Sequence, residues 1–415
     1  MSHQPIATRR DFLNRGLGLI GASAVLPDFL IQSAQAEPSA QSAPQILVVI
    51  EMSGGNDTLS TLIPYGNKAY VEGRKTTRIP ENEIIKLDAE LGFHPRLKGF
   101  KELLDEGQLG ILPGVGYPHP NYSHFSSMDI WHMADERGRC PDVPHGWIGR
   151  AIEGGFAEKS EPILSVAVGA DKSPPALKGP RHSGITFRRP ESFLYTGAQN
   201  DPARKALYQK LHKQPVAQPE GNIDFLSHTA VAANASSEEI RRLASAYKPK
   251  VEYPKSGLAN NLRSIAGLIN GGLDTRIYYT LQGGYDTHSN QRKAHDRLLG
   301  DLNDAIFAFQ KDLAQQGQDE RVLTFSFSEF SRNIVENGSN GTDHGHAGAM
   351  FFFGPRVKPG LQAAYPSLED VYKVRNGALK HNMDFRAVYS TVLKKWLHIP
   401  SEPILGSFPD LDILT

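Results

Sequence analysis

Short apolar runs and longer amphipathic stretches alternate along most of this chain. Runs rich in β-branched and aromatic residues predict buried strands, and they are ILVVI from Ile46, LGILPGV from Leu109, ILSVAV from Ile163, RIYYTL from Arg276, VLTFSF from Val322 and AMFFF from Ala349. Apolar residues at intervals of three and four predict helices over residues 95–106, 258–273, 290–316 and 384–397. Strands that alternate with helices in this way are typical of an open α/β sheet.

The first 36 residues have the features of an export signal. Residues 8–13, TRRDFL, form a twin-arginine motif, a weakly apolar segment follows, and Ala34-Gln35-Ala36 offers a cleavage site. The alternative is a chance arginine pair before a membrane anchor, but the apolar segment is short and is interrupted by Pro27 and Asp28. No other stretch approaches the roughly 20 apolar residues of a membrane span. We therefore predict a signal peptide over 1–36, recognised by the twin-arginine translocase, and a periplasmic or otherwise exported product with no stable membrane span.

Composition argues against a nucleic-acid partner and against disulfide bonds within the chain. The chain has 45 basic and 45 acidic side chains. Residues 1–36 hold three Arg and two Asp, so their removal leaves a net charge of −1 and no basic surplus for nucleic acid. Cys140 is the only cysteine, which rules out an internal disulfide. Residues 37–45, rich in Pro, Ser, Ala and Gln, predict a linker, and residues 46–415 are long enough for one large α/β domain or two.

Acidic and imidazole side chains gather after the predicted strands that begin at Arg276 and Val322. They are Asp286, His288, Glu329, Asp343, His344 and His346. Strand ends are the usual place for a site in an open α/β sheet. Carboxylates with neutral imidazoles suit Zn²⁺, Mn²⁺ or Ca²⁺, although a hydrogen-bonded network that only stiffens the loops is the alternative. For a metal site, we expect at least three of these six side chains within roughly 5 Å of a common point.

A second polar segment, GYPHPNYSHFSSMDIWHM, follows the predicted strand from Leu109. Ser123 is placed to begin a helix whose apolar face would contain Phe125, Met128 and Trp131. The free N–H groups and the dipole at a helix start favour an anion or an alkoxide. Ser123 and His124 are therefore candidate catalytic residues, facing the predicted metal site; an ordinary serine N-cap is the alternative.

Residues 154–254 show a looser pattern, with loops rich in Pro, Lys, Arg and Gly. We interpret this region as an inserted, loop-rich cap that covers the site. The sequence does not indicate what such a cap would recognise.

Six motifs, taken in order, resemble the DUF1501 family of bacterial proteins, which are often exported by the twin-arginine route. The motifs are RRDFL, GGNDTLSTLIPY, GYPHPNYSHFSSMDIWH, GGYDTHSNQ, SEFSR and TDHGHAG, and they extend over essentially the whole chain after the signal. DUF1501 proteins are grouped with the alkaline phosphatase/sulfatase superfamily. The resemblance therefore implies an alkaline-phosphatase-like, doubly wound sheet with helices on both faces, and hydrolysis of phosphate or sulfate esters with one or two divalent metal ions.

The resemblance also implies roles for individual residues. Ser123 is the best match for the superfamily's nucleophile, and Ser126 is second. Asp286-Thr287-His288 is similar to a metal-binding D-x-x-x-H pair, with shortened spacing. The superfamily's later D-H pair corresponds by position to Glu329 and by letter to Asp343-His344, and its final histidine to His344 or His346.

The chain departs from the superfamily pattern at its first strand. Where the superfamily has a metal-binding aspartate, this chain has Glu51 or Ser53, with Asp57 slightly later as a further candidate ligand. Asn56 and Asp57 also suit the cap of the next helix. Because of this difference, the resemblance alone does not fix the number of metal ions or establish that this chain is catalytic.

Two functions of different classes are compatible with these features. The first is an exported, metal-dependent hydrolase that uses Ser123 on a small anionic phosphate or sulfate ester. The second is a catalytically silent periplasmic binding or assembly protein on the same fold, which the missing aspartate favours. A metal-free serine hydrolase has less support, because the chain lacks a G-x-S-x-G motif.

Overall fold

A nine-stranded sheet forms the centre of the computed structural model, which describes residues 43–156, 162–193, 202, 236–369 and 377–415. The strand order is β13-β5-β12-β9-β1-β8-β6-β7, with β14 beside β5. β12 runs antiparallel to both its neighbours, and the other pairings are parallel. The strands are β1 Ile46–Ser53, β5 Leu109–Gly116, β6 Ser165–Val168, β7 Ile185–Phe187, β8 Ile277–Gly283, β9 Val322–Phe327, β12 Gly348–Phe353, β13 Gly360–Leu361 and β14 Met383–Asp384.

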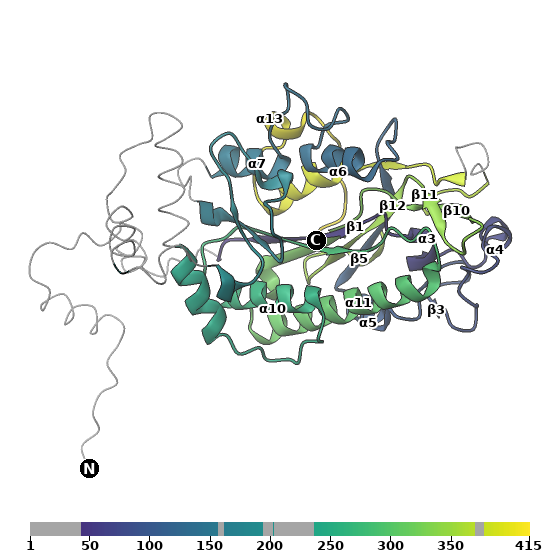
Figure 1. Ribbon diagram of the computed structural model, residues 1–415, viewed down its shortest axis with the longest axis horizontal. Coiled ribbons are helices and arrows are strands. Elements are labelled where there is room, and N and C mark those ends of the chain that lie inside the picture. The colour runs from purple at the N-terminus through teal and green to yellow at the C-terminus, as the bar shows by residue number, and fades with distance from the viewer. Residues whose placement is uncertain (1–42, 157–161, 194–201, 203–235, 370–376) are drawn as a thin grey trace, which may run out of the picture. The chain divides into compact units, whose positions relative to one another are not determined.

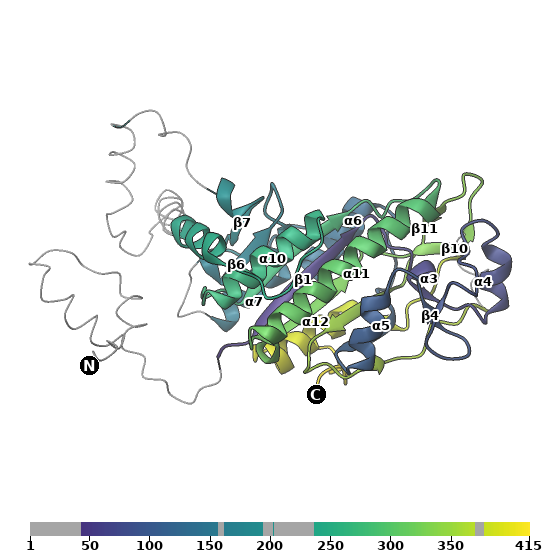
Figure 2. The same cartoon turned by 90° about the horizontal axis from the view of Figure 1, so that it is seen from below.

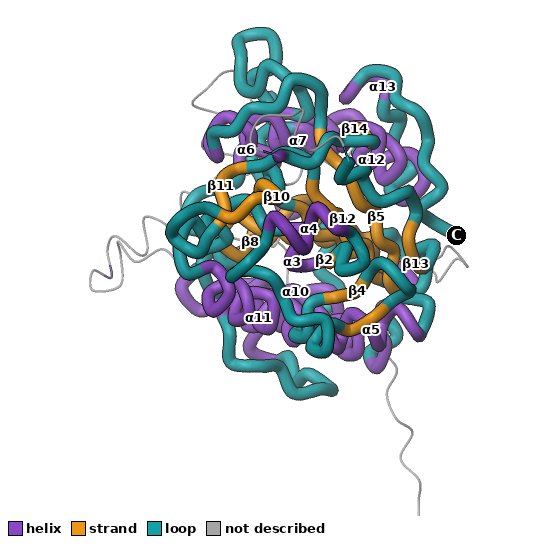
Figure 3. The backbone as a smooth tube through the Cα atoms, turned by 90° about the vertical axis from the view of Figure 1, so that its right-hand side faces the viewer, coloured by secondary structure: helices purple, strands orange, loops and turns teal. Residues whose placement is uncertain are grey.

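Helices cover both faces of this sheet (Figure 3). One layer contains α6 His124–Met133, α7 Trp147–Gly155, α12 Phe385–Thr391 and α13 Glu402–Leu405; the other contains α5 Lys98–Asp105, α10 Gly257–Asn270 and α11 Gln291–Gln315. Figures 1 and 2 show α10 and α11 side by side along the sheet. The predicted α/β class with helices on both faces is therefore confirmed.

Small elements lie at one end of the sheet (Figure 1). They are the short helices α3 Thr58–Thr61 and α4 Lys68–Gly73, the three-stranded sheet β2 Leu62–Ile63, β4 Gly92–Phe93 and β3 Ile85–Lys86, and the antiparallel pair β10 Arg332–Glu336 and β11 Thr342–His344.

The position of strand β1 between two helix layers explains why its sequence is almost continuously apolar. Ile46, Val48, Ile50 and Met52 belong to the core that α5, α10 and α11 cover. Leu47 and Val49 belong to the core beneath α6, α7 and α12. Successive side chains of a strand point to opposite faces, so a strand buried on both sides needs apolar residues at consecutive positions.

The predicted apolar face of α6 is wrong at Phe125, whose side chain is 88% exposed. The buried face instead contains Ser127 and Trp131. The Ser127 hydroxyl and the Trp131 indole N–H both donate to the carbonyl oxygen of Glu329, over 2.7 and 2.9 Å. These bonds place the start of α6 beside the loop that follows β9.

Part of the predicted insertion over 154–254 belongs to the central sheet. Strands β6 and β7 lie in this range and extend the sheet beyond β8. Residues 157–161, 194–201 and 203–235 lie outside the described residues, as do the predicted signal peptide and most of the predicted linker. In the part of the chain that the structure describes, no helix combines the length and apolar character needed to cross a membrane.

Gly54 permits a close approach between two loops. It follows β1 with a φ of 118°, and a Cβ added there would lie 2.6 Å from the backbone nitrogen of Asp286. Both the left-handed conformation and the contact exclude a larger residue.

We predict that Gly54→Ala lowers the free energy of unfolding by roughly 1–3 kcal/mol, because the backbone must adopt a strained conformation and also move. Urea unfolding followed by circular dichroism measures this change. Gly283→Ala is the matched control, since an added Cβ there meets no heavy atom within 4 Å. Equal stability of the two variants would contradict the proposed constraint.

Candidate metal centre

Three histidine side chains converge on one carboxylate oxygen. The Nε2 atoms of His124, His288 and His344 lie 3.3, 3.0 and 3.4 Å from Oδ1 of Asp286. Asp286 and His288 follow β8, His344 ends β11, and His124 is the first residue of α6. Side chains from three separate segments of the sequence thus form one group, called here the His/Asp cluster.

The expected convergence of at least three candidates is present. Asp286, His288 and His344 all belong to the predicted set, and the Nε2 atoms of His288 and His344 are 2.9 Å apart. The cluster adjoins the start of α6, as predicted, through His124. Donor atoms of His124, Asp286 and His344 lie within 4.8 Å of one another, which is compatible with binding of one metal ion.

In each of the three histidines, the Nδ1 atom lies within hydrogen-bonding distance of an oxygen atom. Nδ1 of His124 lies 2.7 Å from Oε1 of Glu329, Nδ1 of His288 lies 2.9 Å from Oδ1 of Asp343, and Nδ1 of His344 lies 2.6 Å from the carbonyl oxygen of Tyr122. Carboxylates and carbonyls only accept, so each Nδ1 carries the proton. When such a ring is neutral, its Nε2 lone pair faces the cluster, which is the usual arrangement of metal-binding histidines.

In the structure, Glu329 and Asp343 contact the Nδ1 atoms of His124 and His288. Glu329 is 1% exposed, accepts hydrogen bonds from the backbone nitrogen of Gly54 over 2.9 and 3.2 Å, and orients His124. Its hydrogen bond raises the pKa of His124. Asp343 orients His288 and accepts a hydrogen bond from Asn337 over 3.1 Å. Both carboxylates thus support histidines of the cluster through hydrogen bonds.

Arg332 holds the loops around Asp286 together. Its fully buried guanidinium donates to the carbonyl oxygens of Gly54, Gly55, Tyr285 and Thr342 and to Oδ1 of Asp286, the last over 2.6 Å. Partial burial raises the pKa of Asp286, but the hydrogen bond and charge of Arg332 outweigh this and lower it to about 2. Asp286 is therefore ionised at neutral pH.

Four observations show that the cluster and the carboxylates around it fit a divalent cation. With neutral histidines, the carboxylates of Asp286, Glu329 and Asp343 against the single guanidinium leave two uncompensated negative charges. Two imidazole lone pairs face each other at 2.9 Å, which is favourable only with a cation or proton between them. Nε2 of His124 is buried without a hydrogen-bond partner among the described residues. Spacings near 3 Å also match neighbouring ligands at about 2.0–2.2 Å from one zinc ion.

Asp57, another predicted ligand, is engaged elsewhere. Its carboxylate forms two hydrogen bonds with Arg74, of 2.7 and 3.0 Å, and both side chains are fully buried. Burial raises the pKa of Asp57, but Arg74 more than compensates and holds it well below its usual range. Arg74 also donates to the carbonyl oxygens of Asn333 and Ile334, so this ion pair fastens the loop after β1 to β10.

Two other candidates are also displaced from the cluster. Nε2 of His346 lies 2.9 Å from the carbonyl oxygen of Tyr117, and burial lowers the pKa of His346 to about 4. Glu51 faces the helix layer that contains α6, where its carboxylate lies 3.0 Å from Nε2 of His132 and accepts a hydrogen bond from the Tyr279 hydroxyl. Strand β1 thus supplies no side-chain carboxylate to the cluster.

Ser123 occupies the N-cap position of α6, next to His124, and is exposed. Its side chain makes no capping hydrogen bond. Its backbone N–H donates to the side chain of Asn121 over 2.9 Å. The hydroxyl is therefore available to a ligand rather than committed to the helix.

The DUF1501 family model, described as a protein of unknown function, matches residues 198–395. The predicted DUF1501 resemblance is confirmed over this range. The DUF1501 segment contains Asp286, His288, Glu329, Asp343 and His344, whereas Ser123 and His124 precede it. No curated protein matches the chain.

Solved structures with a related arrangement share little sequence. Ps i-CgsB in complex with k-i-k-neocarrahexaose is 10% identical at a TM-score of 0.38, covering 89% of this chain and 75% of that one. Murine ectonucleotide pyrophosphatase/phosphodiesterase 5 in complex with AMP is 8% identical at 0.39, covering 89% and 97%. The PsFucS1 sulfatase from Pseudoalteromonas sp. is 11% identical at 0.37, covering 88% and 70%.

Proposed function

We propose that this chain is an exported, metal-dependent hydrolase of phosphate or sulfate esters. The observation that carries the proposal is the set of three histidines whose Nδ1 atoms are held by oxygens while their Nε2 atoms converge on Asp286. The Nε2 atoms of His288 and His344, 2.9 Å apart, need a cation or a proton between them. The ester class rests on the resemblance to the alkaline phosphatase/sulfatase superfamily.

His124, His288, His344 and Asp286 would hold the cation. Three imidazoles with one carboxylate favour Zn²⁺ or a similar transition metal over Ca²⁺, which prefers oxygen ligands. When bound, the cation would supply positive charge that neutralises the phosphoryl or sulfuryl group.

The chain's own residues would position the reacting groups. Ser123 lies one residue from His124, so its exposed hydroxyl is carried on the same rigid helix start that enters the cluster. Glu329 and Arg332, both buried, keep His124 and Asp286 in place. We propose that the Ser123 oxygen attacks the phosphorus or sulfur atom while the bond to the ester oxygen breaks, and that the serine proton passes to that oxygen through solvent so that an alcohol leaves. Water then hydrolyses the serine ester and releases phosphate or sulfate. The N–H groups at the start of α6 would stabilise the negative charge on the transferred group.

We predict that His344→Ala and Asp286→Asn each weaken zinc binding by more than about 100-fold, since even loss of an outer partner costs about 10- to 100-fold. Competition with a chelating dye measures the affinity, and a shift in melting temperature on adding Zn²⁺ gives an independent readout. His398→Asn removes an exposed histidine outside the cluster and serves as the control. Unchanged zinc affinity in both cluster variants would refute the metal centre.

We predict that Ser123→Ala reduces turnover of p-nitrophenyl phosphate or sulfate by at least about 1,000-fold, as expected when the attacking group is lost. The unfolding free energy should change by less than about 0.5 kcal/mol, because the hydroxyl caps no backbone N–H. Ser126→Ala, which removes an exposed hydroxyl three residues further along the same helix, is the control. Full activity in the Ser123 variant would show that another group attacks the ester.

We propose that export follows the twin-arginine route. Replacing Arg9 and Arg10 with Lys should retain the protein in the cytoplasm with its signal attached, because the translocase recognises the arginine pair. Arg15→Lys lies in the same signal outside the pair and should be exported normally. Cell fractionation and blotting measure the outcome, and processed protein in the periplasm of the double variant would rule the route out.

A catalytically silent binding protein is the second candidate. Glu51 supports it, because that carboxylate is held under α6 and β1 contributes no acidic ligand to the cluster. Zinc binding that depends on His344 and Asp286, without turnover of phosphate or sulfate esters, would favour this candidate.

A further inference from the structure

A basic cavity lies at the same edge of the sheet as the His/Asp cluster. It has a volume of about 380 Å³ and lies at the carboxyl ends of β6, β7 and β8, where Gly169, Arg188, Arg189, Gln282 and Gly283 contribute to its wall. We call it the arginine cavity. Its remaining wall comes from the start of α10 and from Arg297 and Asp301 of α11.

The cavity carries an excess of positive charge. Arg188, Arg189 and Arg297 face a single acidic residue, Asp301. The guanidinium of Arg189 makes no ion pair or hydrogen bond with any residue that the structure describes. Arg188 and Arg297 meet carboxylates only at 3.9 and 4.0 Å. Exposed pairs at such distances are weak, so no carboxylate of the described residues holds these guanidinium groups tightly.

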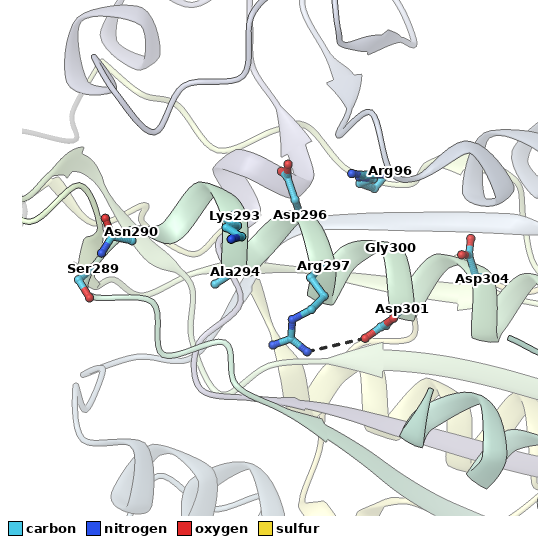
Figure 4. A pocket seen from close by; sticks show the side chains of 10 residues that line it. All are labelled: Arg96, Ser289, Asn290, Lys293, Ala294, Asp296, Arg297, Gly300, Asp301 and Asp304. Carbon is cyan, nitrogen blue, oxygen red and sulfur yellow. Dashed lines mark ion pairs between the residues drawn. The ribbon is translucent and has the colours of Figure 1, made fainter. Parts of the chain in front are cut away.

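This excess distinguishes the arginine cavity from its neighbour. A second cavity of about 750 Å³ runs along α11 and shares Arg297 and Asp301, whose ion pair Figure 4 shows as a dashed line. Its charged residues are balanced, with Arg96, Lys293 and Arg297 against Asp296, Asp301 and Asp304. An anion would therefore be attracted to the arginine cavity and not to the larger one.

The start of α10 also favours an anion in the arginine cavity. This helix has 14 residues, and Gly257 and Leu258 at its start line the cavity. The side chain of Ser256 accepts a hydrogen bond from the backbone nitrogen of Ala259 only, which leaves other N–H groups at the positive end of the helix dipole.

The arginine cavity and the His/Asp cluster share one edge of the sheet. Strand β8 lies between β1 and β6. Its last residue, Gly283, lines the cavity, and Asp286 in the cluster follows three residues later. Three residues span roughly 10 Å at most, so the cavity wall at Gly283 lies within that backbone distance of Asp286.

We propose that the arginine cavity binds a second oxyanion, a phosphate or sulfate group, of the same substrate whose ester group occupies the His/Asp cluster. This inference rests on the proposed hydrolase function. The inference narrows the substrate class to esters that carry a second anionic group. The guanidinium groups would form charge-assisted hydrogen bonds with the second group, and this contact would select such substrates over monoanionic esters.

The first experiment tests the cavity without relying on catalysis. Inorganic phosphate and sulfate are titrated separately into chelator-treated full-length protein at low ionic strength, and binding is measured by calorimetry. Arg189→Gln should weaken binding of the bound anion by at least about fivefold. Arg263→Gln removes an exposed arginine from α10 outside the cavity and should leave the affinity unchanged. Absence of binding by both anions, or equal affinity in the two variants, would overturn the proposal.

The second experiment tests the link to the substrate. The KM of hexane-1,6-diol bisphosphate is compared with the KM of p-nitrophenyl phosphate in the Arg189→Gln and Arg263→Gln variants. Arg189→Gln should raise the KM of the bisphosphate at least about fivefold more than that of the monophosphate, whereas Arg263→Gln should change neither. Equal effects on both substrates would overturn the link. If no ester is hydrolysed by the unmodified protein, the hydrolase function fails, and the calorimetric result still decides whether the cavity binds an oxyanion.

Discussion

Burial of the parallel strands on both faces is the constraint on which the rest of the structure depends. Helices cover each side of the sheet, so the strand interiors are filled with apolar side chains. The registers pair Ser53 with Gly283 and Glu51 with Phe327, which brings the carboxyl ends of β8, β1 and β9 to one level. Polar groups that follow these strands therefore meet at a single edge, where water and ligands have access.

Buried charges give this edge its rigidity. Glu329 and Arg332 are almost fully inaccessible, yet each has several hydrogen-bond partners from different loops. Removing one partner from such a buried charge commonly costs about 3–5 kcal/mol of folding free energy, so the loss of any of these contacts is strongly unfavourable. By contrast, 48% of the Asp286 side chain and 43% of the His288 side chain are exposed. A rigid inner layer thus supports an outer layer that remains open to a cation and a substrate.

The same edge offers two kinds of chemistry at adjacent strands. Around β9, β1 and β8 the groups are imidazoles and carboxylates with a net negative charge, which suits a cation. Around β8, β6 and β7 they are guanidinium groups, which suit an oxyanion. Because β8 belongs to both sets, a substrate with two anionic groups has one place for each on a single rigid surface. This juxtaposition comes from strand order, since β6 and β7 lie far in sequence from the residues of the cluster.

The strands and helices of the described chain could be predicted from local patterns. The apolar runs at Ile46, Leu109, Val322 and Ala349 became strands of the central sheet, and the long amphipathic stretch over 290–316 became α11. These predictions held because periodic burial depends on neighbouring residues in the chain. The prediction for Phe125 failed because long-range bonds from Ser127 and Trp131 to the Glu329 carbonyl set the rotation of α6.

By itself, the sequence determined the α/β class, the loops that contain the candidate site, and the residue types suited to a metal ion. Only the tertiary structure decided which way each side chain points. Arg74, fixed between β10 and the loop after β1, withdraws Asp57 from the cluster. Glu329 turns to His124, and strand alternation sends Glu51 beneath α6. These choices depend on partners far away in sequence and on competition for buried hydrogen bonds, neither of which leaves a local pattern in the chain.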